Sequence, residues 1–122
     1  LGARLPAHAT STGRVLLAAL PRAQFQAWMK GRLLARLTMH TVTEARAFRA
    51  LIESVRRDDC CLSSEEHELG VHALAVPLRN LQGHTVAALN AVASTARLSG
   101  AAMQRDLLPL LWEAAREVRG LL

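Results

Sequence analysis

Apolar residues recur at helical spacing in the first thirty positions of the chain. They share one side of a predicted helix over residues 13–20, which follows three hydroxyl residues at 10–12. Pro21 ends this helix and suits the start of a second one, predicted over residues 22–29, in which Phe25 and Trp28 lie three positions apart. The two segments therefore predict a short helical hairpin.

A third amphipathic helix is predicted after residue 43. Thr43 is the expected N-cap and Glu44 lies in the first turn, where a negative charge is favourable. The helix should end near the charged run at 56–59. Its apolar face contains Ala47, Phe48, Leu51, Ile52 and Val55.

The apolar pattern changes from a helical period to alternation in the second half of the chain. Two strands are predicted over residues 71–78 and 85–92, joined by a turn at 80–83. Pro77 should lie at a strand end or a sheet edge, because proline cannot donate a ladder hydrogen bond. Residues 61–66 favour a short strand or an extended lead-in.

The last helix is predicted over residues 101–120, with a kink or restart at Pro109. Its helically spaced apolar positions are Met103, Leu107, Leu108, Leu111, Ala114, Ala115 and Val118. Two strands alone make a poor sheet, so further strands should come from residues 36–41 or 60–63, from before Leu1, or from a partner chain. The pattern favours the α/β (α+β) class.

The 122 residues fit one domain, and an apolar content of 51% allows a core without metals or crosslinks. The longest apolar runs are too short to cross a membrane. The chain opens without Met or a signal-like segment, so we expect a piece of a longer cytoplasmic protein. The net charge of +5 is spread along the chain, and only 3% of residues are aromatic, which disfavours DNA binding or base stacking by this segment.

Catalytic and metal chemistry find little support. His67 and His72 are one residue too far apart for the helical His-Glu-x-x-His zinc pattern, so no metal or cofactor is expected. The adjacent Cys60 and Cys61 should be reduced thiols. A small hydrolase using Cys61 or Ser63 with His67 stays an alternative, although no nucleophile elbow is present. The carboxylates of Glu65, Glu66 and Glu68 are expected to be solvated.

The hydroxyl residues before the first helix favour a binding site for an anion. One hydroxyl, from Thr10 or Ser11, is enough to cap the helix. The remaining hydroxyls and the unpaired amides at the helix start can hold the carboxylate of a small organic acid. Asn90, a polar residue inside an apolar strand, needs hydrogen-bond partners if it is buried, and a ligand or a backbone carbonyl would supply them.

Taken together, these segments resemble the effector-binding domain of IclR-type transcriptional regulators. The similarity lies in residues 4–21, in Leu37, Thr38 and Thr41, and in residues 65–90 and 107–118. The "AALN", "ALAVP" and "LPAHATSTGRVLLA" strings are similar to the subgroup that regulates the beta-ketoadipate pathway. Asp59 and Cys60 depart from the Gly-Tyr usual in this family.

The resemblance implies a GAF-like domain with an antiparallel sheet and a pocket for an aromatic acid or a dicarboxylate. It also implies a homo-dimer or tetramer, with DNA contacted only by a winged helix-turn-helix domain elsewhere in the protein. The chain would be a sensor and no enzyme, the alternative being a ligand-independent oligomerisation module. With Thr10 added from the capping argument, the implied ligand-binding residues are Leu5, Thr10, Ser11, Thr12, Ser63, Val71, Ala73, Asn90 and Val92.

Overall fold

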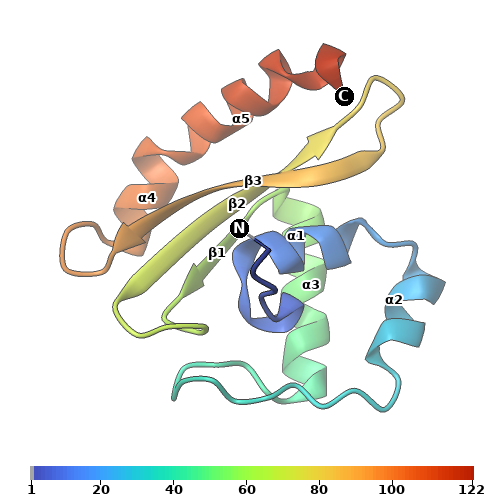
Figure 1. The fold of residues 1–122 in the computed structure, drawn as a ribbon, viewed down its shortest axis with the longest axis vertical. Helices are drawn as coiled ribbons and strands as arrows, with labels where there is room; N and C mark the ends of the chain where they lie inside the picture. The colour runs from blue at the N-terminus through green and yellow to red at the C-terminus, as the bar shows by residue number, and fades with distance from the viewer. Residues whose placement is uncertain (1) are drawn as a thin grey trace.

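A computed structural model describes residues 2–122 and contains a three-stranded antiparallel sheet (Figure 1). The strands are β1 (Cys61–Ser64), β2 (Val71–Arg79) and β3 (Thr85–Ser94), in the order β1-β2-β3. The alternating segments predicted as a hairpin are thus β2 and β3, and the third strand comes from residues 61–64. Residues 36–41 form no strand in the structure.

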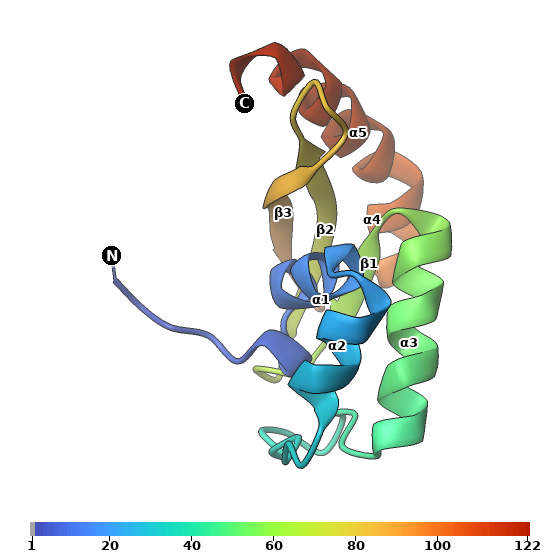
Figure 2. The same ribbon diagram turned by 90° about the vertical axis from the view of Figure 1, so that its right-hand side faces the viewer.

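Helices cover both faces of the sheet (Figures 1 and 2). Side chains alternate along β2, so that Leu74 and Val76 pack against one helical layer and Ala75 against the other. The first layer consists of α4 (Gly100–Asp106) and α5 (Leu108–Glu117). The second layer is built on α1 (Ser11–Ala19), preceded by a 3-10 turn at Ala7–Ala9.

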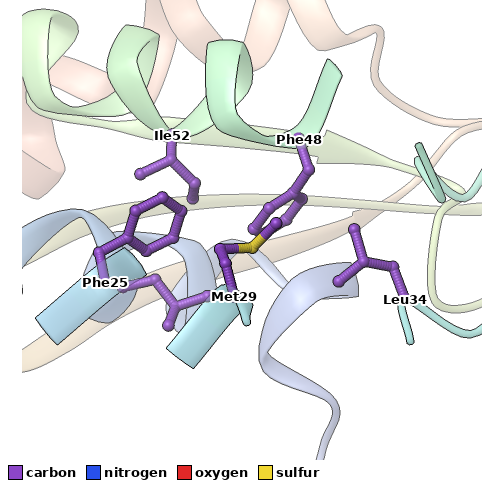
Figure 3. Close-up of a cluster of buried hydrophobic side chains, with 6 residues drawn as sticks. Phe25, Met29, Leu34, Phe48 and Ile52 are labelled. Carbon is purple, nitrogen blue, oxygen red and sulfur yellow. The ribbon is translucent and has the colours of Figure 1, made fainter. Parts of the chain in front are cut away.

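Away from the sheet, a cluster of apolar side chains joins α1 to the two helices that follow it, α2 (Arg22–Met29) and α3 (Ala45–Asp58). Figure 3 shows Phe48 and Ile52 of α3 meeting Phe25 and Met29 of α2, with Leu34 at one end of the cluster. The amphipathic face predicted for α3 therefore faces the core, and α2 has the predicted bounds.

Two prolines interrupt the regular elements, and Pro77 is not at a strand end or a sheet edge as predicted. Pro77 lies in the central strand, but β1 pairs only with residues 72–75, so no strand on that side needs an N–H from Pro77. The final helical segment is interrupted at Leu107 and restarts as α5 with Pro109 in its first turn. A short 3-10 turn, Arg119–Leu121, follows α5.

The predicted N-cap of α3 was wrong by one residue. Glu44, and not Thr43, caps α3, because the Glu44 carboxylate accepts hydrogen bonds from the amides of Arg46 and Ala47 at 3.0 and 2.9 Å. The Thr43 hydroxyl instead accepts a hydrogen bond from Arg36. The first helix also begins earlier than predicted, at Ser11, since Thr10 is its cap.

Asp59 ends α3 in a left-handed conformation with φ of 57°, a position where glycine is usual. Its carboxylate pairs with both terminal nitrogens of Arg79 at 2.6 and 3.0 Å. Its carbonyl accepts a hydrogen bond from the indole N–H of Trp112. The departure from the family's glycine therefore leaves the turn intact and connects α3 to β2 and α5. Within residues 2–122, no helix has both the length and the apolar character needed to cross a bilayer.

Candidate ligand-binding cavity

A cavity of about 310 Å³ lies between the start of α1 and the adjacent face of the sheet. All nine residues predicted as ligand-binding line this one cavity: Leu5, Thr10, Ser11, Thr12, Ser63, Val71, Ala73, Asn90 and Val92. Four further lining residues were not predicted, namely Ala9, Glu66, His67 and Glu68. The structure therefore brings together residues that are up to 87 positions apart in the sequence.

The start of α1, whose first residues line this cavity, has hydrogen-bonding groups without partners inside the helix. Thr10 is the cap: its hydroxyl accepts from the Gly13 amide at 3.2 Å and donates to the Pro6 carbonyl at 3.1 Å. The first intrahelical hydrogen bond runs from the Arg14 amide to the Thr10 carbonyl, so the amides of Ser11 and Thr12 have no partner inside the helix.

Ser11 differs from its neighbours because its hydroxyl is buried and unsatisfied. The residue is only 1% exposed, and its Oγ has no hydrogen-bond partner within residues 2–122. A buried hydroxyl without a partner costs about 1–3 kcal/mol, so such groups are rare in folded proteins and call for an explanation. The position of Ser11 on the wall of a cavity supplies one.

The sheet forms the opposite wall through residues that share a face. Ser63, Ala73 and Val92 are cross-strand neighbours, and Asn90 pairs with Ala75 in the next row. Asn90 would need hydrogen-bond partners inside the protein if it were buried, but in the structure it is exposed. The reason is that β3 is an edge strand in the described residues, where Val92 on the same face is exposed as well.

Gly13 allows α1 to lie close to the turn before it. A Cβ added at Gly13 would fall 2.4 Å from the Ala7 Cα and 2.7 Å from the Thr10 hydroxyl. Both distances are far below ordinary contact, and one of the neighbours is backbone. The small residue in "STGR" therefore serves close packing of the wall that carries Thr10 and Ser11.

We expect Gly13→Ala to lower the free energy of unfolding by about 1–3 kcal/mol, because overpacking at this point must shift the Ala7 backbone. Urea denaturation followed by circular dichroism measures the effect. Gly120→Ala is the matched control, since a Cβ at Gly120 meets nothing within 4 Å. Equal stability of both variants would contradict the close approach.

Glu66, one of the residues that line the cavity, forms a buried ion pair with Arg14. Arg14 is 0% exposed and its two terminal nitrogens bind both oxygens of Glu66 at 2.6 and 2.5 Å. The Arg14 Nε also donates to the His8 carbonyl at 2.8 Å, in the turn before α1. The expectation that Glu66 is solvated was therefore wrong, because Arg14 compensates its charge and makes burial tolerable.

Glu66 is also hydrogen-bonded to the segment before α3. The Glu66 carboxylate accepts from the Val42 amide at 3.0 Å, and the Glu66 carbonyl accepts from the Thr41 hydroxyl at 2.6 Å. The Thr38 hydroxyl donates to the Glu65 carbonyl. Thr38 and Thr41 therefore have a structural role. In the sequence they stood out only as part of the family resemblance.

The Cys61 thiol is not activated as a nucleophile, and His72 does not lie beside Ser63. Burial raises the pKa of the Cys61 thiol to about 11, with the nearby Arg14 opposing the shift, so this group stays protonated at neutral pH. His72 bonds Ser64 at 2.8 Å, on the opposite sheet face from Ser63. No group of three or more histidines, cysteines or carboxylates suited to a metal is found in residues 2–122.

Both cysteines should therefore react slowly with iodoacetamide in the folded protein at pH 7, because each is buried and its pKa is raised. Mass spectrometry after timed labelling measures this, with the urea-unfolded chain as the control. Rapid modification of Cys61 alone would contradict the protonated thiol and would favour the hydrolase alternative.

A larger hollow of about 460 Å³ lies between α2 and α3. It contains none of the predicted site residues and is lined mainly by exposed charged side chains, including Arg22, Lys30 and Arg49. The cavity beside α1 is the stronger candidate site because it alone contains the unsatisfied Ser11 hydroxyl.

The comparison with known proteins identifies the family. A family described as "Bacterial transcriptional regulator IclR C-terminal" matches residues 1–119 of the chain. The chain belongs to this family. The predicted resemblance is thus confirmed, and so is the mixed α/β fold of an IclR effector-binding domain.

Similar proteins refine this placement within the IclR family. The p-hydroxybenzoate hydroxylase transcriptional activator and the Pca operon regulatory protein, both from Acinetobacter baylyi, are each 49% identical over 99% and 100% of this chain. The chain spans 45% and 44% of the length of these two proteins.

The crystal structure of a double mutant of the PobR inducer-binding domain from Acinetobacter, in complex with 3-hydroxybenzoic acid, has a TM-score of 0.95 and 49% identity. It matches 100% of this chain and 70% of that domain. These relatives are transcriptional regulators, and the predicted resemblance to the subgroup that regulates the beta-ketoadipate pathway is confirmed.

Proposed function

We propose that the cavity beside α1 binds a small aromatic carboxylic acid and that the chain is the sensor domain of a transcriptional regulator, without an enzymatic activity of its own. The observation that carries the proposal is the buried Ser11 hydroxyl, which has no hydrogen-bond partner within residues 2–122 and lies beside the amides of Ser11 and Thr12, which have no partner inside the helix. A carboxylate at this point would accept hydrogen bonds from these groups and interact favourably with the helix dipole.

The opposite wall suits a ring rather than a polar chain. Val71, Ala73 and Val92 offer apolar surface, with Leu5 at the rim. Ser63 and Asn90 are the polar groups on the sheet side, and each can hydrogen-bond a ring substituent. The volume of about 310 Å³ is at the small end of ligand cavities, which fits one ring. Related proteins are named for p-hydroxybenzoate hydroxylase control and solved with 3-hydroxybenzoic acid, which supports this class of ligand.

The regulator as a whole is proposed to contain a second domain and more than one chain. The chain spans less than half of its curated relatives, and the matching family is a C-terminal one, which supports a separate winged helix-turn-helix domain for DNA. We propose that residues 1–122 are the effector-binding domain and that the regulator is a homo-oligomer. The acid would act only by binding one quaternary arrangement more tightly than another.

Isothermal titration calorimetry tests the proposed site. We expect 3- and 4-hydroxybenzoate to bind at a stoichiometry of one per chain, and 4-hydroxybenzamide to bind at least about tenfold more weakly, a difference of about 1.4 kcal/mol, since it lacks the charge that the helix start favours. Binding of the amide as tightly as the acid would overturn the carboxylate position. Absence of binding by either acid at millimolar concentration would overturn the proposed function.

A further inference from the structure

The charges around the cavity are asymmetric, and this asymmetry limits the ligands that fit. Among its lining residues in the described chain there are two glutamates, Glu66 and Glu68, and neither lysine nor arginine. The positive potential available to a ligand therefore comes from the start of α1, where the dipole is equivalent to roughly half an elementary charge.

The two glutamates are not equivalent. Glu66 is neutralised by Arg14, which binds both of its oxygens from behind the cavity wall. Glu68 is exposed and forms no ion pair with any residue in 2–122. The wall thus carries one uncompensated negative charge, with His67 as the adjacent polar side chain.

The turn that carries Glu68 is held in place by its own hydrogen bonds. The Glu65 carboxylate accepts from the Gly70 amide at 3.0 Å, and the Glu65 amide donates to the Val71 carbonyl at 2.8 Å. On the other side, the Thr95 amide donates to the Gly70 carbonyl at 2.9 Å. These bonds anchor both ends of the 65–70 turn and so fix the backbone position of Glu68 at the cavity.

We propose that Glu68 is a specificity-determining residue that rejects acids carrying a second negative charge. The inference rests on the proposed function, because it assumes that one carboxylate occupies the start of α1. A second carboxylate on the same ligand would lie in a cavity with Glu68 and with no lysine or arginine among the described lining residues. A hydroxyl in its place can instead donate a hydrogen bond, which makes hydroxylated aromatic monocarboxylates the preferred class over dicarboxylates.

The test uses two ligands of nearly equal size that differ by one charge, 4-carbamoylbenzoate and terephthalate. We expect the wild-type chain to bind 4-carbamoylbenzoate at least about tenfold more tightly than terephthalate, a gap of about 1.4 kcal/mol. Glu68→Gln should reduce this gap to about threefold or less. Added salt should also reduce it in the wild-type chain, because exposed charges are screened.

Glu113→Gln is the matched control, since it removes the same formal charge from α5, on the other side of the sheet, and should leave the gap unchanged. A wild-type chain that binds both ligands equally, a gap that persists in Glu68→Gln, or a gap that Glu113→Gln removes equally would each overturn the role of Glu68. Binding of 4-hydroxybenzoate but of neither larger ligand would show exclusion by size and would also overturn it. Failure of 4-hydroxybenzoate itself to bind would overturn the proposed function instead.

Discussion

Arg14→Met is expected to lower the free energy of unfolding by about 3–5 kcal/mol, because it leaves the Glu66 carboxylate buried without its cationic partner. Glu66 is only 8% exposed, and in the described residues the Val42 amide is the one other donor to its carboxylate. The variant also loses the bond from Arg14 to the His8 carbonyl. Urea denaturation followed by circular dichroism measures the change.

Arg22→Met provides the matched comparison, since it breaks the Arg22–Glu53 pair, in which both side chains are exposed. Exposed pairs contribute little to stability, so this variant should be far closer to the wild type. Replacing both partners, as in Arg14→Met with Glu66→Leu, should recover part of the loss because no charge is then left buried. A similar loss from Arg14→Met and Arg22→Met would show that the buried pair does not support the fold.

The helices and strands could be predicted because each has a period that its local sequence displays. The alternation in β2 and β3 and the apolar face of α3 are signals contained within about ten residues. The predicted cap of α3 was wrong by one residue because Thr43 and Glu44 are both chemically suited to the position. In the structure the Thr43 hydroxyl accepts a hydrogen bond from Arg36, and the Glu44 carboxylate caps the helix.

The Arg14–Glu66 pair could not be predicted in this way. Its partners are 52 positions apart, and nothing in the local sequence marks either one as buried. Charged residues are rarely buried, so the default expectation for Glu66 was a solvated side chain. The hydroxyl cluster at 10–12 was a better local signal, because one cap cannot use three hydroxyls. Which hydroxyl remained unpaired still required the geometry that assigns the cap to Thr10.

Ser11→Leu is expected to reduce hydroxybenzoate affinity by about 100-fold or more, equivalent to about 2.7 kcal/mol. The larger side chain would occupy the cavity and remove the hydroxyl. Calorimetry measures the affinity, and circular dichroism shows whether the fold is retained. A folded Ser11→Leu chain that binds hydroxybenzoate as tightly as the wild type would contradict the site. An intact regulatory response of this variant in the whole protein would favour the alternative of a ligand-independent oligomerisation module.

Ser11→Ala separates ligand binding from stability, because the two effects have opposite signs. The Ser11 hydroxyl has no partner in the described chain, so its removal should leave the free energy of unfolding unchanged or raise it by up to about 1 kcal/mol. The same substitution should weaken hydroxybenzoate binding about tenfold, as expected for the loss of a hydrogen bond to a carboxylate. Thr10→Ala should behave differently and cost about 1 kcal/mol of stability through the lost cap. If Ser11→Ala instead destabilises the chain as Thr10→Ala does, the hydroxyl serves the fold and the argument for a carboxylate at this helix start fails.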